Sequence, residues 1–210
     1  MKNDTLQKLT YQLVSKLFVL PIYKFVFRGH LIGRENIPQK NSFIMVSNHG
    51  SLLDPPLLGH ALRCNISFMA KAELFKIPLL GFIIKACGAY PVKRGIADKN
   101  TIKTACKKLS NDNSIGIFID GTRQKNGRVN KPKQGAALLA FKNQKLLLPV
   151  AIVNSHRLIR FKFCFPLFSK IVIKVGTPVQ PPQSSSKDEL NLVTMHLKDE
   201  INNLIGWIFN

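Results

Sequence analysis

The chain has 210 residues, of which 45% are hydrophobic and 20% charged, a composition that excludes an intrinsically disordered protein and predicts one globular domain. Lysine and arginine number 31 against 11 aspartates and glutamates, which gives a net charge of +20. This excess of positive charge favours an anionic partner: nucleic acid, an anionic bilayer or a phosphorylated small molecule.

The N-terminal segment has the pattern of an amphipathic helix with basic residues. Its leucines are spaced by three and four residues and so share one helical face: Leu6, Leu9, Leu13, Leu17 and Leu20. Pro21 is expected to interrupt this helix, and residues 22–27 are expected to form a second short one. We therefore predict that residues 1–29 are membrane-associating amphipathic helices that precede a domain over 30–210. An ordinary helix packed on its own domain is the alternative interpretation.

From residue 30 onward, short apolar runs alternate with helical patterns. The predicted strands cover residues 43–47, 66–70, 89–92, 114–119, 147–152, 160–165 and 171–175. The predicted helices cover residues 55–62, 98–109, 134–144 and 187–208. Strands and helices that take turns along the chain predict an α/β fold with a mostly parallel sheet flanked by helices. The short connection between the last two strands predicts that they form an antiparallel addition.

The sequence predicts no membrane-spanning helix, no secretory signal and no metal or redox site built from cysteines. The longest run without Asp, Glu, Lys or Arg is residues 41–53, which is too short for a membrane-spanning helix, and no secretory signal is recognisable. The cysteines are far apart, have neither metal-ligand nor redox spacing, and are expected to be buried free thiols: Cys64, Cys87, Cys106 and Cys164.

A histidine and an aspartate lie between the first predicted strand and the first predicted helix, in the stretch SNHGSLLDPP over residues 47–56. A neutral imidazole can accept a proton at neutral pH, and a nearby carboxylate can fix its tautomer. His49 and Asp54 are therefore a candidate general base and its positioning residue. Asp54 followed by Pro55 is also typical of a helix N-cap, and one carboxylate can serve both roles.

Candidate anion-binding groups follow two other strands. The turn at Gly121 and Thr122 offers backbone N–H groups and a hydroxyl to an anion, and Arg123 adds a planar guanidinium. Arg94 follows the strand over 89–92 and is a second candidate phosphate ligand, with an ordinary surface arginine as the alternative.

Two apolar segments have sequences that allow more than one position in the folded protein. Pro149 lies within the strand over 147–152, which predicts an edge strand, a first position or a bulge. The segment from Leu74 to Ile84 fits an acyl-chain pocket or a lipid contact, and it fits plain core equally well.

These elements together resemble a known family. The matching blocks, in order, are Asn48-His49-x4-Asp54, Arg94 after an apolar strand, Asp120-Gly121-Thr122-Arg123, and Leu148-Pro149-Val150. Lys71-Ala72-Glu73-Leu74 also fits the stretch between the first two blocks. The set is similar to the glycerolipid acyltransferase family, and most like its 1-acyl-sn-glycerol-3-phosphate acyltransferases. The resemblance runs from about Gly33 to Pro178 and makes residues 30–210 an acyltransferase domain.

The resemblance implies a mechanism. His49 would take the proton from the free hydroxyl of a lysophosphatidate-like acceptor, and Asp54 would orient His49. The hydroxyl would attack the thioester of an acyl-CoA or an acyl carrier protein, giving phosphatidate for phospholipid synthesis. The acceptor's phosphate would be held by Lys71, Arg94, Gly121, Thr122 and Arg123. The supporting residues would be Asn48, Asp120 and Pro149.

This chain departs from the family pattern at Asp120, where glutamate is usual, and at Gln124, where serine is common. A carboxylate that is one methylene shorter keeps its charge and loses reach. The role of this position, and with it the identity of the acceptor, is left open by the sequence.

The family chemistry needs no cofactor and no metal, because the acyl thioester is a co-substrate. The expected partners are an anionic membrane surface, the lysophospholipid, and acyl-CoA or acyl carrier protein, with a location on the cytoplasmic face of a membrane. Glycerol 3-phosphate or another lipid is an alternative acceptor. A basic nucleic-acid-binding α/β protein is the alternative from a different class, although the scattered basic residues and the lack of a nucleic-acid motif disfavour it.

Overall fold

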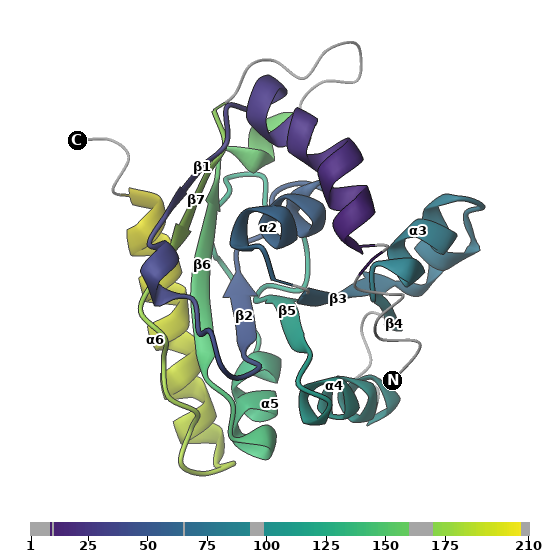
Figure 1. Cartoon of the computed structure of the whole chain (residues 1–210). Helices are drawn as coiled ribbons and strands as arrows, with labels where there is room; N and C mark the ends of the chain where they lie inside the picture. Colours follow the sequence, from purple (N-terminus) through teal and green to yellow (C-terminus); the bar gives the residue numbers. More distant parts are fainter. Residues whose placement is uncertain (1–8, 10, 65, 93–98, 160–169, 207–210) are drawn as a thin grey trace.

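The structure, a computed structural model, describes residues 9, 11–64, 66–92, 99–159 and 170–206. Within these residues one seven-stranded sheet has the order β1-β7-β6-β2-β5-β3-β4 (Figure 1). Its strands are β1 (His30–Ile32), β2 (Ile44–Ser47), β3 (Ile66–Lys71), β4 (Tyr90–Val92), β5 (Ser114–Phe118), β6 (Leu147–Val153) and β7 (Val172–Val175). Neighbouring strands are parallel except for β6 and β7, which confirms the mostly parallel sheet. The strand predicted over 160–165 lies outside the described residues.

The α-helices are α2 (Asp54–Leu62), α3 (Leu80–Ala86), α4 (Lys99–Ser110), α5 (Gly135–Asn143) and α6 (Lys187–Gly206). Four of them confirm the helices predicted from periodicity, to within about two residues at the described ends. Short 3-10 segments are η3 (Arg34–Asn36), η4 (Ala72–Lys76) and η5 (Ser155–Ile159). Strand β1 and helix α3 were not predicted.

Helices cover both faces of the sheet, so the protein has two apolar cores. The alternation of side chains along β2 shows the division, because Ile44 and Val46 join one core while Met45 joins the other. The first core includes Leu109 of α4, Leu139 of α5 and Leu197 of α6. The second includes Leu57 and Leu58 of α2 together with Tyr23 and Phe27 of the N-terminal helix.

The N-terminal segment is helical throughout residues 11–26, and the expected interruption at Pro21 is wrong. Two π-helical turns, η1 (Ser15–Val19) and η2 (Ile22–Val26), flank the proline, which itself has helical φ and ψ of −59° and −45°. The amide of Leu20 donates to the carbonyl of Ser15, five residues back. Such a widened turn relieves the clash between a proline ring and the preceding turn, so the helix continues.

Pro149 lies inside the sheet between β2 and β7, where a proline removes one donor from the ladder. The predicted edge or first position is therefore wrong, and the extra residue of the local irregularity lies in the segment opposite the proline. Two residues of β6 separate the Leu147–Val179 bridge from the Val150–Val175 pair, whereas three residues separate Val175 from Val179. The register thus changes by one residue beside the proline, and the amide of Gly176 donates to the proline's carbonyl over 2.9 Å.

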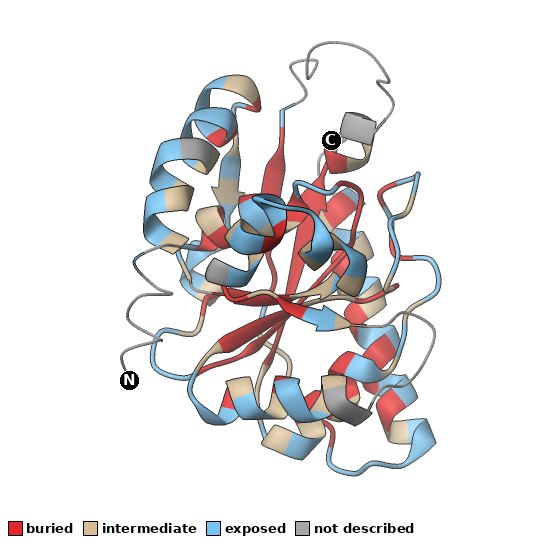
Figure 2. Ribbon diagram, turned by 90° about the vertical axis from the view of Figure 1, so that its right-hand side faces the viewer, coloured by how far each residue is buried: buried red, intermediate tan, exposed pale blue. Residues whose placement is uncertain are grey.

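The strands in the middle of the sheet are buried, whereas many residues of the surrounding helices are exposed (Figure 2). Two groups of these exposed residues have large apolar side chains. Large apolar side chains are exposed along one side of the N-terminal helix: Leu9, Leu13, Leu17 and Leu20. A second group lies around the start of α3: Ile77, Leu79, Leu80 and Phe82. The plain-core interpretation is therefore wrong for these four residues of the segment from Leu74 to Ile84. In the described part of the chain, none of the helices combines the length and apolar character needed to cross a bilayer.

Candidate active site

The candidate residues gather at the edge of the sheet where the parallel strands end. Ser47, the last residue of β2, pairs with Phe118 of β5 on one side and with Val150 of β6 on the other. Residues that follow β2 and β5 therefore emerge side by side. In open α/β sheets, this carboxyl edge is where ligands usually bind.

His49 and Asp54 form a close, buried pair at this edge. The Nδ1 atom of His49 lies 2.8 Å from Oδ2 of Asp54, and the carboxylate side chain has no exposed surface. The same oxygen accepts hydrogen bonds from the backbone amides of Gly50 (2.7 Å) and Ser51 (2.8 Å). The turn between β2 and α2 thus wraps around the carboxylate and holds it against the imidazole.

The Asp54 carboxylate determines which nitrogen of His49 carries the proton. A carboxylate only accepts hydrogen bonds, so Nδ1–H donates and the lone pair of the neutral ring resides on Nε2. The N-cap predicted for Asp54 is wrong, because Leu53 is the cap residue and no side-chain cap bond forms. The carboxylate instead turns back to the amides that precede the helix.

The aromatic ring of Phe118 stacks on the imidazole of His49, a contact that the sequence analysis did not predict. The rings of Phe118 and His49 stack with a centroid separation of 3.9 Å and an interplanar angle of 14°. Phe68 of β3 lies next to Phe118, at 5.7 Å between centroids. Because the register pairs the end of β2 with the end of β5, strand pairing itself brings the two rings together. Together with the Asp54 hydrogen bond, the stacking fixes the plane of the His49 ring.

Asn48 connects three segments of the edge through its buried amide. Its Nδ2 donates to the carbonyls of Gly127 (2.7 Å) and Ile152 (2.8 Å), and its Oδ1 accepts from the amide of Ile152 (2.8 Å). The backbone carbonyl of His49 accepts from the amide of Gln124 over 2.8 Å. The turn that carries His49 is therefore joined to β6 and to the loop after β5.

Asp120 organises that loop from within. Its buried carboxylate accepts hydrogen bonds from the amides of Asn130 (3.2 Å) and Lys131 (2.8 Å). Gly121 follows with φ of +69°, a left-handed conformation that favours glycine. The short aspartate side chain suits two backbone donors that lie close to the end of the strand.

The remaining candidates differ in their positions. Thr122 and Arg123 are exposed in the turn after β5, and Lys71 is exposed at the end of β3. The Lys71 Nζ lies 3.2 Å from Oε1 of Glu73. The pKa of Glu73 is lowered first by its backbone hydrogen bond and then by the lysine. Arg94 lies outside the described residues, while Val92, two positions earlier, pairs with Lys71 at this edge.

Among the residues that the structure describes, no cluster of three or more His, Cys, Asp or Glu side chains is arranged to hold a metal ion. The chemical groups that the site offers are a polarised imidazole, backbone amides and exposed cations.

Comparison with known proteins agrees with this geometry. Residues 28–153, which include β1 through β6 and all the candidate residues, match the family model described as Acyltransferase. The chain belongs to the acyltransferase family.

Individual relatives that are similar to this chain carry the names of particular acyltransferases. A 1-acyl-sn-glycerol-3-phosphate acyltransferase of Borreliella burgdorferi is 28% identical over 80% of this chain and 68% of its own length. The enzyme of that name from Streptococcus pneumoniae is 31% identical over 68% of this chain and 54% of its own. The crystal structure of the 1-acyl-sn-glycerophosphate (LPA) acyltransferase PlsC from Thermotoga maritima is 27% identical, with a TM-score of 0.71 and 95% coverage of both chains.

Proposed function

We propose that the protein is a 1-acylglycerol-3-phosphate O-acyltransferase, which transfers a fatty acyl group from a thioester to the free hydroxyl of lysophosphatidate. The observation that carries the proposal is the buried His49–Asp54 pair at the carboxyl edge of an acyltransferase-family sheet. The names of several relatives support lysophosphatidate as the acceptor. Glycerol 3-phosphate is the alternative acceptor, and nucleic-acid binding remains the alternative from another class.

The proposed step is a direct transfer without an acyl-enzyme. The Nε2 of His49 takes the proton from the acceptor hydroxyl as that oxygen attacks the thioester carbonyl carbon. The carbon–sulfur bond breaks, and the proton passes from Nε2 to the departing thiolate, so the products are phosphatidate and a free thiol. Asp54 keeps the proton on Nδ1 and stabilises the imidazolium that forms during the step.

The acceptor's phosphate is assigned to cations and amides. Arg123 and Lys71 at the same edge supply positive charge, and the turn at Gly121 and Thr122 supplies a backbone amide and a hydroxyl. Arg94, which lies outside the described residues, is assigned to the phosphate from its place in the sequence. Asp120, Asn48 and Pro149 act by shaping the backbone around these groups. No cofactor is needed, and acyl-CoA or acyl carrier protein is the co-substrate.

The proposed location is the cytoplasmic face of an anionic membrane, where the lysophospholipid resides. The exposed leucines of the N-terminal helix and the apolar side chains around α3 are the proposed contact surface.

The test of the proposed reaction follows thiol release from acyl-CoA and from acyl carrier protein. Each donor is combined with lysophosphatidate, with monoacylglycerol as an acceptor that lacks the phosphate, and with glycerol 3-phosphate. We expect turnover with lysophosphatidate that falls by at least about a hundredfold in His49→Ala, since general-base catalysis contributes roughly that factor or more.

The matched control is His196→Ala, which removes an exposed histidine from α6 and should keep full activity. Circular dichroism verifies that both variants are folded. Equal turnover of the wild type and His49→Ala would overturn the assignment of the base. Equal use of lysophosphatidate and monoacylglycerol would overturn the phosphate-binding assignment.

A further inference from the structure

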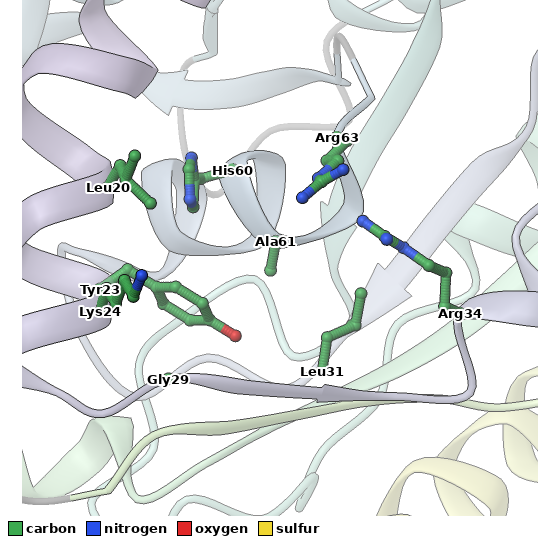
Figure 3. Close-up of a pocket in the computed structure, with 9 residues that line it drawn as sticks. All are labelled: Leu20, Tyr23, Lys24, Gly29, Leu31, Arg34, His60, Ala61 and Arg63. Atoms are coloured by element: carbon green, nitrogen blue, oxygen red, sulfur yellow. The ribbon is translucent and has the colours of Figure 1, made fainter.

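A cavity lies at the opposite end of α2 from His49. It has a volume of about 340 Å³ and opens between the N-terminal helix, β1 and the last turn of α2 (Figure 3). Helix α2 has 9 residues and is therefore about 14 Å long, which separates this cavity from the His49–Asp54 pair at the helix start. The proposed acyl transfer uses none of the residues that line it.

Three cationic side chains are among the residues that line the cavity. Lys24, Arg34 and Arg63 line it, and Figure 3 shows the guanidinium groups of Arg34 and Arg63 directed toward each other. Within the described residues, no ion pair joins any of the three to an Asp or Glu side chain. Both arginines are exposed, and an anion placed between them would be attracted by both guanidinium groups. Arg63 also complements the C-terminal end of α2, but no helix end explains Arg34.

A buried hydroxyl without a partner gives the second indication of a ligand. Tyr23 is only 8% exposed, and its hydroxyl is buried without a hydrogen-bond partner among the described residues. The tyrosine points into the cavity, between Ala61 and Leu31 (Figure 3). A buried hydroxyl is costly to leave unpaired, so its donor is available to an acceptor oxygen in the cavity.

The local packing holds this tyrosine in place. A Cβ atom on Gly29 would lie 2.2 Å from the Tyr23 ring, so only glycine permits the ring to rest against the backbone there. His60 contacts the tyrosine edge to face at 5.5 Å between centroids, and its Nδ1 lies 2.7 Å from the hydroxyl oxygen of Ser15. Burial, and then Arg63, lowers the pKa of His60, which favours a neutral ring.

The size and walls of the cavity indicate what kind of anion fits. Its volume corresponds to roughly ten water molecules, at about 30 Å³ each, which exceeds the space that a phosphate group alone requires. The rest of the wall is apolar at Leu20, Leu31 and Ala61.

We propose that this cavity is a binding site for the headgroup phosphate of an anionic phospholipid, separate from the active site. Arg34 and Arg63 bind the phosphate from two sides, the Tyr23 hydroxyl donates to one of its oxygens, and the apolar wall contacts the glycerol and the first methylenes of the acyl chains. The site would select anionic lipid at the place where the N-terminal helix meets the domain. It is independent of acyl transfer.

The test uses short-chain lipids below their critical micelle concentrations, so that bilayer insertion makes no contribution. Isothermal titration calorimetry measures the binding of dihexanoyl phosphatidylglycerol, of dihexanoyl phosphatidylcholine with its zwitterionic headgroup, and of inorganic phosphate. We expect the anionic lipid to bind more tightly than the other two. We expect the doubly substituted R34Q/R63Q protein to bind it at least about tenfold more weakly, and Tyr23→Phe to weaken it to a smaller extent.

The matched control is K103Q/K107Q, which removes two exposed cations from α4 and should bind like the wild type. Acyl transfer to lysophosphatidate by R34Q/R63Q should persist, which separates the two sites. Unchanged binding by R34Q/R63Q, or equal binding of the zwitterionic lipid, would overturn the proposal. If inorganic phosphate bound as tightly as the anionic lipid, the site would be one for free phosphate and the lipid assignment would be wrong.

Discussion

At the scale of single residues, the candidate active site depends on backbone polar groups that side chains satisfy. One oxygen of Asp54 accepts hydrogen bonds from the His49 ring and from two backbone amides. The side-chain amide of Asn48 donates hydrogen bonds to β6 and to the loop after β5. The carboxylate of Asp120 accepts hydrogen bonds from two backbone amides of the same loop. Replacing a buried side chain that makes two or three such hydrogen bonds lowers the stability of the fold, because each lost bond leaves a buried backbone group without a partner. The site geometry is therefore coupled to the stability of the fold.

Asn48 offers the most direct measurement of this coupling. The change Asn48→Ala leaves two carbonyls and one amide without partners in a buried place, so we expect it to lower the free energy of unfolding by about 2 to 4 kcal/mol. Urea denaturation followed by circular dichroism measures the change. Asn203→Ala, at an exposed position on α6, is the matched control and should change the free energy by less than about 0.5 kcal/mol. A loss no greater than that of the control would mean that water replaces the three bonds.

Asp120 illustrates what sequence patterns can and cannot predict about a site. The motif blocks identified this position and those of His49 and Asp54, since chemistry that depends on residue type leaves a local pattern. The bonds from Asp120 to Asn130 and Lys131 were not predicted, because they depend on how a loop ten residues away returns to the strand end. The stacking of Phe118 on His49 was missed for a similar reason, since it depends on the register between β2 and β5.

At the scale of elements, the helices that periodicity predicted are those with one apolar face on a core. Helix α6 is an example, with Leu190, Val193, Leu197 and Ile201 buried at steps of three and four. Strand β1 was not predicted because it has three residues and is fixed by pairing with β7, about 140 positions later. Helix α3 was not predicted because several of its apolar side chains face outward, so its sequence lacks the alternation of a half-buried helix.

The N-terminal helix has two different faces, and each corresponds to one of the two interpretations of its sequence. Tyr23 and Phe27 are buried in the core beside α2, as expected for a helix packed on its own domain. Gly59 of α2 makes this contact close, since a Cβ there would overlap the Tyr11 hydroxyl. Leu13 and Leu17, on the opposite side, are about 60% exposed. The exposed face is the one available to a bilayer.

This division gives a prediction for the helix. The doubly substituted L13Q/L17Q protein should sediment less with vesicles of anionic phospholipid, because about 1.5 to 3 kcal/mol of apolar transfer is lost for each leucine that would otherwise be buried. Its melting temperature should remain within a few degrees of the wild type, since both side chains are exposed in the folded protein. Leu192→Gln replaces a leucine that is 66% exposed on α6, and it serves as the control for a general loss of surface hydrophobicity. Undiminished sedimentation of L13Q/L17Q would assign membrane contact to another surface, with the residues around α3 as the next candidate.

At the scale of the whole molecule, the proposed membrane contact combines two features, the net charge of +20 and the exposed apolar side chains. In the proposed function, the anionic partners of this basic surface are lipids and the phosphorylated substrate. Charge and apolar contact differ in their response to salt. Electrostatic attraction to anionic lipid is screened over a distance that shrinks from about 10 Å at 0.1 M salt to about 3 Å at 1 M. Apolar insertion is not screened.

The two contributions can therefore be separated by one titration of the intact protein. With anionic vesicles, raising sodium chloride from about 0.1 M to about 1 M should reduce the sedimented fraction without abolishing it, because the leucine face still inserts when the charges are screened. With vesicles of zwitterionic lipid, the sedimented fraction should be lower at the outset and nearly independent of salt. L13Q/L17Q should lose binding to anionic vesicles almost completely at high salt, since both contributions are then removed. If the wild-type protein were insensitive to salt, the net charge would play no part in membrane binding, and its explanation would have to come from the phosphorylated substrate alone.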